Sequence, residues 1–151
     1  MSMDTPTKIV TLSEVDCIRL VGTHSVGRIC IVDDGFPIAV PVNYRMVFTA
    51  GDAMSIIMRV RRDGLVDQPG RTASLEIDDI DHCLQIGWSV VARGVLHRVD
   101  EENAPPWLAQ WDPRPWVVER DTWIYLEVTA LSGRELVESN AAWSFEVRGY
   151  L

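Results

Sequence analysis

The feature that most constrains this chain is a series of short segments in which apolar and polar residues alternate, separated by turn signals. These segments cover residues 27–32, 37–47, 54–60, 72–77, 87–99 and 122–129. The turns after the first two contain Asp-Asp-Gly at residues 33–35 and Ala-Gly-Asp at residues 50–52, and Gly beside Asp is typical of hairpin turns. Six short strands in series with few helices predict a mainly β fold, a small barrel that is closed or nearly closed.

One amphipathic helix is predicted ahead of these strands, over residues 12–22. Ser13 can cap its first turn and Gly22 provides a stop. Its helically spaced apolar residues, which we expect to face a core, are Val15, Ile18 and Val21. A second short helix is expected around residues 101–111.

Two residues interrupt the alternating segments. Pro41 lies inside 37–47 and implies an edge strand, a bulge, or a place where a ligand takes over the hydrogen bonds of the ladder. Gly94 lies inside 87–99, where a barrel strand could bend sharply. Residues 78–83, between the fourth and fifth segments, are predicted as a polar connection. Residues 131–136, after the sixth segment, are predicted as a turn and extension.

Charge and cysteine content limit the function classes. Fourteen Lys and Arg against 22 Asp and Glu give a formal net charge of −8, which argues against a general nucleic-acid binder because such proteins need a basic face. The cysteines Cys17, Cys30 and Cys83 form no CxxC pair. We therefore expect a protein of a reducing compartment in which each cysteine acts as a small hydrophobic side chain. The N-terminus lacks the apolar core of a signal peptide, and no apolar run approaches the ~20 residues of a membrane span. We therefore expect a cytoplasmic protein without membrane or nucleic-acid partners.

No metal site is expected. Asp78, Asp79, Asp81 and His82 contain metal-ligating residue types, but consecutive carboxylates on a loop usually face solvent, and no second His or Cys cluster accompanies them. No Ser-His-Asp arrangement or Gly-rich phosphate loop is present either. The sequence therefore identifies no catalytic residue.

Several motifs carry a resemblance when they are taken in order. Val26-Gly-Arg-Ile follows the first helix, and Val40-Pro-Val-Asn-Tyr lies in the second strand. Residues 76–81 come after the fourth strand, and residues 87–94 lie in the fifth. Together they resemble the pyridoxamine 5′-phosphate oxidase-like family of FMN-binding split barrels, and residues 111–116 and 131–136 are similar to its actinobacterial branch. The resemblance runs over residues 12–136, which we interpret as an FMN-binding split-barrel domain between an N-terminal tail of residues 1–11 and a C-terminal extension of residues 137–151.

What the resemblance implies is a six-stranded Greek-key split barrel with a few short peripheral helices. It further implies a homodimer with two FMN sites at the subunit interface, and a flavin-dependent oxidoreductase that acts on a small-molecule substrate.

The resemblance also implies where the cofactor binds. The isoalloxazine ring is expected against the second and third strands, and the phosphate at the end of the third, where alternation puts Arg59 and Arg61 on one face and an arginine fork suits a phosphate. Trp88 could stack on the ring and Ser89 could donate to it. The expected cofactor-binding residues are Pro41, Val42, Asn43, Tyr44, Met58, Arg59, Val60, Arg61, Trp88 and Ser89.

A proline-punctuated loop carries three further candidates, Trp111, Arg114 and Trp116. Such residues either enclose a substrate pocket or pack in a dimer interface, where Trp and Arg are enriched. Arg114 would contact an anionic substrate if it reaches the site of the partner subunit.

The chain departs from the family pattern just after the third strand. Arg62-Asp-Gly-Leu stands where many members have a lysine and a hydroxyl, and the carboxylate of Asp63 would repel a phosphate. This departure leaves a deazaflavin, a haem or an unphosphorylated flavin open as ligands. It also leaves open a non-catalytic dimeric binding protein that has lost tight cofactor affinity.

Overall fold

The structure is a computed structural model that describes residues 7–100, 102 and 104–139. Seven strands, one α-helix and one 3-10 helix have defined bounds within these residues. They are β1 (Thr7–Thr11), α1 (Glu14–Val21), β2 (Val26–Asp33), β3 (Phe36–Thr49), β4 (Ala53–Val60), β5 (Thr72–Asp81), β6 (Ile86–Arg98), the 3-10 helix η2 (Leu108–Trp111) and β7 (Thr122–Glu138).

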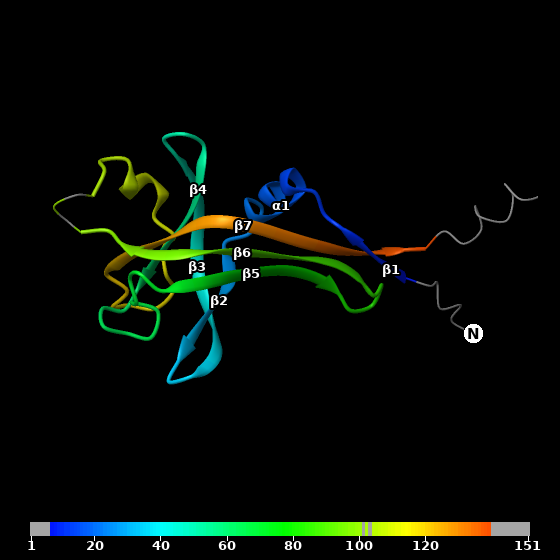
Figure 1. Cartoon of the computed structure of the whole chain (residues 1–151), viewed down its shortest axis with the longest axis horizontal. Helices are drawn as coiled ribbons and strands as arrows, with labels where there is room; N and C mark the ends of the chain where they lie inside the picture. The colour runs from blue at the N-terminus through cyan, green and yellow to red at the C-terminus, as the bar shows by residue number, and fades with distance from the viewer. Residues whose placement is uncertain (1–6, 101, 103, 140–151) are drawn as a thin grey trace, which may run out of the picture.

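Six of the strands close into a barrel. The sheet is antiparallel in the order β7-β4-β3-β2-β5-β6, and β6 pairs back with β7 to complete the ring. The pairings β2–β5 and β4–β7 join strands that are not consecutive, which makes the connection a Greek key. In Figure 1, β5, β6 and β7 run side by side along the long axis of the molecule, whereas β3 and β4 run across it. The predicted mainly β split barrel is confirmed.

A seventh strand, β1, lies where the sequence predicts a tail. It pairs with the far end of β7, from Thr7 opposite Glu138 to Thr11 opposite Arg134. All five of its residues are exposed, so β1 lacks the buried alternate face that identifies a strand in a sequence.

The barrel interior is filled by alternate residues of each strand. The fully buried side chains include Ile29, Tyr44, Ile56, Met58, Leu75, Ile77, Leu96, Ile124 and Leu126. Helix α1 closes one side of this core with Cys17, Leu20 and Val21, and Ser13 caps the helix by accepting from the Asp16 N–H. The expected inward position of Val15 is wrong, because Val15 is 75 % exposed while Cys17 takes the buried position. Cys30 is half-buried and Cys83 exposed.

Several predicted element boundaries need correction. Residues 131–136 belong to β7, which is a single strand of 17 residues, and residues 78–81 belong to β5. Of the predicted helix over residues 101–111, the structure contains η2 at Leu108–Trp111, and residues 101 and 103 lie outside the described part. The irregularity predicted at Gly94 is confirmed, since the β6–β7 register shifts between Arg93 and Gly94.

A second, smaller apolar cluster lies outside the barrel wall. Val47 of β3 and Ile57 of β4 pack there with Leu108 of η2, and Val99, Trp123 and Tyr125 complete the cluster. The segment 104–121 is thereby held at the end of the barrel opposite β1 (Figure 1). No helix in the described part of the chain has the length and apolar character to cross a membrane.

Candidate functional site

Among the described residues, strand β3 has a free edge along its first half. It pairs with β2 over residues 36–43 but with β4 only from Tyr44 to Thr49. The Tyr44 N–H donates to the Ser25 carbonyl (2.9 Å), so even-numbered residues of β3 turn their main-chain groups towards β2 and odd-numbered residues turn theirs away. Pro37 and Pro41 are odd, so the missing N–H of each falls on the free edge. The expectation that Pro41 marks an edge is confirmed.

Three of the expected cofactor-binding residues face the barrel interior. Tyr44, Met58 and Val60 are buried in the core, and half-buried Val42 packs against it. The Tyr44 hydroxyl donates to the Val21 carbonyl (2.5 Å), and burial raises the pKa of Tyr44 because the phenolate would lose its hydration. Tyr44, Met58 and Val60 therefore offer a ligand main-chain atoms rather than side chains.

Arg59 points out of the barrel and meets Asp112 from the segment 104–121. Its Nη1 donates to Oδ2 (3.0 Å) and Oδ1 (3.3 Å) of Asp112, and its guanidinium carbon lies 5.4 Å from the centre of the Trp123 ring. The two side chains of the ion pair are 27 % and 30 % exposed. The Nε of Arg59 is buried and has no hydrogen-bond partner among the described residues. An unpaired buried donor is costly, so the present position of Arg59 leaves one of its donors unsatisfied.

The loop candidates gather around the same ion pair. The Arg114 N–H donates to Asp112 Oδ1 (2.9 Å), and the Trp116 N–H donates to Asn43 Oδ1 (3.4 Å). One chain thus brings together two groups of predicted residues. Asn43 and Arg59 were expected to bind the cofactor, and Arg114 and Trp116 to contact the substrate or the partner subunit. We call this group the Arg59 cluster: Asn43, Arg59, Asp112, Arg114 and Trp116.

Sequence reasoning missed Asp112. Its only sequence signal is an Asp-Pro-Arg-Pro turn, and nothing in that turn indicates an arginine 53 residues away. Asp67 was missed in the same way, although its buried carboxylate accepts from Arg98 (2.8 Å) and from the Asp63 N–H (2.8 Å). The hydrogen bond to Asp67 is the main reason that the pKa of Arg98 is raised. This pair fixes the loop after β4, while Arg61 and Arg62 stay exposed.

Trp88 and Ser89 lie far from the Arg59 cluster. Trp88 is opposite Glu135 and Arg59 is opposite Trp123, and these positions on β7 are separated by roughly 40 Å of extended strand. The ring of Trp88 instead packs against the ring of His24, with 5.0 Å between the ring centroids. The Nε2 atom of His24 lies 3.4 Å from Asp79 Oδ2. Trp88 and Arg59 therefore pair with opposite halves of β7.

Two hollows border the segment 104–121. One, of about 630 Å³, lies between the end of α1 and β3 and includes His24, Arg45, Phe48, Trp107 and Trp111 in its lining. The other, of about 440 Å³, lies between this segment and the outer face of β3, β4 and β7. Trp111 therefore lines a cavity, as a substrate-pocket residue would.

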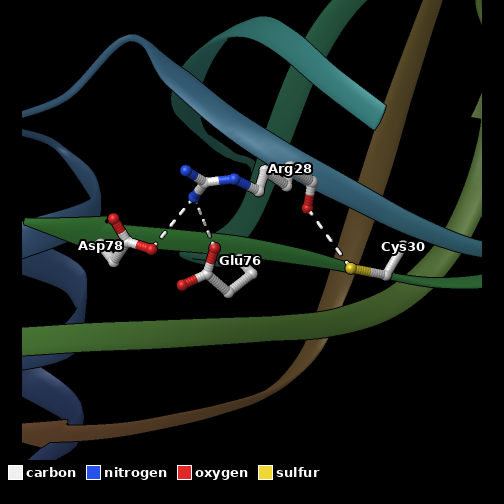
Figure 2. Close-up of polar contacts among 4 residues, drawn as sticks. All are labelled: Arg28, Cys30, Glu76 and Asp78. Atoms are coloured by element: carbon white, nitrogen blue, oxygen red, sulfur yellow. Dashed lines mark hydrogen bonds and ion pairs between the residues drawn. The ribbon is translucent and has the colours of Figure 1, made fainter. Parts of the chain in front are cut away.

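A separate charged group joins β2 to β5. Figure 2 shows Arg28 of β2 reaching across to two carboxylates of β5, and its Nη1 lies 3.0 Å from both Glu76 Oε2 and Asp78 Oδ2. Burial and the nearby Asp78 raise the pKa of Glu76. These strands are paired over only three residues, so the contact serves to hold the barrel together. Within the described ranges, no group of three His, Cys, Asp or Glu side chains could hold a metal ion.

Comparison with known proteins gives a consistent result. The model of the family described as pyridoxamine 5′-phosphate oxidase matches residues 13–135. No curated protein matches the chain.

Solved structures share the fold. A conserved protein of unknown function from Corynebacterium diphtheriae is 22 % identical, with a TM-score of 0.72 over 85 % of this chain and 98 % of that one. The FAD binding protein from Mycobacterium smegmatis is 24 % identical, with a TM-score of 0.60 over 85 % and 98 %. The FAD and haem binding protein from the same organism is 15 % identical, with a TM-score of 0.53 over 93 % and 80 %. At these identities the likeness concerns the fold alone.

Proposed function

Because the chain belongs to the pyridoxamine 5′-phosphate oxidase-like family, we propose that it binds a flavin nucleotide, FMN, between the Arg59 cluster and the free edge of β3. The observation that carries the proposal is Arg59 itself. It is a half-buried arginine at the end of β4, and its Nε donor has no partner among the described residues. Guanidinium groups with unused donors are well suited to hold phosphate.

The surrounding residues fit such a ligand. The odd-numbered residues of β3 present main-chain carbonyls, and the N–H groups of Ala39 and Asn43, along an edge that no described strand covers. Main-chain donors and acceptors of this kind match the polar rim of a flavin ring. Arg61 and Arg62 add positive charge beside Arg59. A bound flavin would supply redox chemistry, and the protein would bind and orient the flavin and its small-molecule substrate. We therefore propose a flavin-dependent oxidoreductase.

The site is proposed to lie between two copies of the chain. Trp116 and Val118 are 82 % and 87 % exposed beside the Arg59 cluster, which is typical of a surface that another protein covers. A homodimer would also let Trp88 and Ser89 of a second copy approach the Arg59 cluster.

A non-catalytic dimeric binding protein is the second candidate. It is favoured by Asp112, which already neutralises Arg59, and by Asp63 in the loop after β4. Such a protein would bind a deazaflavin, a haem or no ligand tightly.

Titration of the purified full-length protein with FMN, FAD, riboflavin, a deazaflavin and haem tests the proposal. We expect saturable FMN binding, and Arg59→Ala should weaken it by about ten- to a hundredfold while changing riboflavin binding little, since only FMN carries the phosphate. Arg19→Ala removes one exposed arginine on α1 and serves as the control. Equal losses for FMN and riboflavin would show that Arg59 does not hold the phosphate. Preference for FAD would change the identity of the flavin, and absence of any flavin binding would favour the second candidate.

A further inference from the structure

Asp112 occupies the position on Arg59 that an anionic ligand would take. Both of its carboxylate oxygens accept from the same nitrogen, Nη1, at 3.0 and 3.3 Å. Carboxylate and phosphate oxygens compete for the same guanidinium donors. While this ion pair is formed, the positive charge of Arg59 is compensated from within the chain.

The ion pair with Asp112 nevertheless leaves one hydrogen-bond donor of Arg59 unpaired within the described residues. All of its hydrogen bonds to Asp112 pass through Nη1, and the buried Nε has no partner in the described residues. A carboxylate that matched the arginine fork would engage two nitrogens. The geometry is that of a partial substitute for a ligand, in contrast to the Arg98–Asp67 pair, where Nε and Nη2 of the arginine both donate to the buried carboxylate.

The segment that carries Asp112 is attached unevenly. Leu108 is buried in the small outer cluster, so the start of the segment is anchored. Beyond Asp112, the polar contact between the described residues of this segment and the barrel is the long Trp116 N–H to Asn43 Oδ1 hydrogen bond of 3.4 Å, and the Trp116 side chain is exposed. Arg114 also has a φ of 48°, which is unfavourable for a residue that precedes a proline. Pro113 is buried and anchors the backbone next to Asp112, whereas Arg114 and Trp116 to Glu119 are exposed. The Asp112 carboxylate itself is held by its contacts with Arg59 and the Arg114 N–H.

We propose that Asp112 is a specificity-determining residue that competes with the ligand phosphate for Arg59. The Asp112 carboxylate turns away from Arg59 when a phosphate-bearing ligand binds, and Asp112 narrows the difference in affinity between phosphorylated and unphosphorylated flavins. The flavin part of this proposal rests on the proposed function, whereas the competition for an anion does not.

Asp112→Asn tests the competition, because it removes the charge and keeps an oxygen that can accept from the Arg114 N–H. In the full-length protein we expect FMN to bind at least about tenfold more tightly than in the wild type, with riboflavin changed less than about twofold. Asp112→Ser, which also shortens the side chain, should act in the same direction. Asp52→Asn is the matched control, since it removes one carboxylate from an exposed turn where Asn tolerates the φ of 59°.

Inorganic phosphate provides a measurement that needs no flavin. Asp112→Asn should bind phosphate more tightly than the wild type in calorimetric titrations at low ionic strength, and Asp52→Asn should not. If phosphate binding improves and no flavin binds, the competition by Asp112 stands and the proposed function fails. If FMN binds and the ratio of FMN to riboflavin affinity is the same in wild type and Asp112→Asn, the competition is refuted and the proposed function stands.

Discussion

Tyr44 connects the barrel core to the end of helix α1 through one buried hydrogen bond. Its side chain is fully buried, and its hydroxyl donates to the Val21 carbonyl. Tyr44→Phe keeps the ring and removes the donor, which leaves that carbonyl without this partner. We expect the free energy of unfolding to fall by about 1–2 kcal/mol, as measured by urea denaturation at pH 7. An unchanged midpoint would show that water replaces the hydroxyl.

The raised pKa of Tyr44 gives this residue a pH signature. The folded state favours the protonated phenol, so the stability that Tyr44 contributes is intact below its ordinary pKa of 10.0 and is lost as the pH rises above that value. The wild type should therefore lose more stability than Tyr44→Phe between pH 9 and pH 11. Parallel curves in urea unfolding experiments over this range would contradict the shift.

Residue positions were predictable where they follow from strand alternation. The outward position of Arg59 on β4 follows from its apolar neighbours Met58 and Val60, both of which are buried. The partner of Arg59 was not predictable, because Asp112 lies in an irregular loop and reaches Arg59 only through the closed barrel and η2. The role of Tyr44 in the core was not predictable either, since a tyrosine side chain is equally suited to a core and to a ligand site.

At the scale of elements, Gly94 allows β6 and β7 to approach each other at the bulge. A Cβ atom at this position would lie 1.8 Å from the main-chain oxygen of Glu127, so the backbone itself would have to move. Gly94→Ala is expected to cost more than about 3 kcal/mol or to prevent folding. Urea unfolding followed by circular dichroism measures the loss.

Gly35 provides the comparison for this substitution. It has a φ of 79° and no atom within 4 Å of an added Cβ, so Gly35→Ala pays only the conformational cost of about 1 kcal/mol. Similar losses for both variants would mean that close approach at the bulge is not what requires Gly94.

The bulge at Gly94 was predictable from the sequence, because a glycine inside a long apolar strand already predicted an irregularity. The continuation of β7 through residues 131–136 was not predicted, because Ser132 and Gly133 are typical turn residues and it is their pairing with β6 that keeps them extended.

At the scale of the whole molecule, the barrel was predictable and its surroundings were not. Six amphipathic strands of this length have few ways to bury their apolar faces other than closure. The position of residues 104–121 depends instead on a few long-range contacts, such as Leu108 on Val47 and Ile57. The distance between Trp88 and Arg59 is also a consequence of strand pairing, which local sequence patterns do not determine.

The proposed homodimer makes the last prediction. A chain with a formal net charge of −8 repels its own copies, so association must come from apolar contact and should strengthen as salt screens the repulsion. Trp116 and Val118 are the most exposed large apolar residues in the described part of the chain. Replacing both with serine should convert a dimer to a monomer in light scattering.

Phe36→Ser is the control, because Phe36 is also highly exposed but lies in the β2–β3 hairpin. If the wild type is monomeric, or if the double variant remains dimeric, the segment 116–118 does not form a dimer interface. If the flavin lies between the two copies, the double variant should also lose FMN binding together with dimerisation. A monomeric variant with full FMN affinity would place the flavin site within a single barrel, where Arg59 and the free edge of β3 alone would have to hold it.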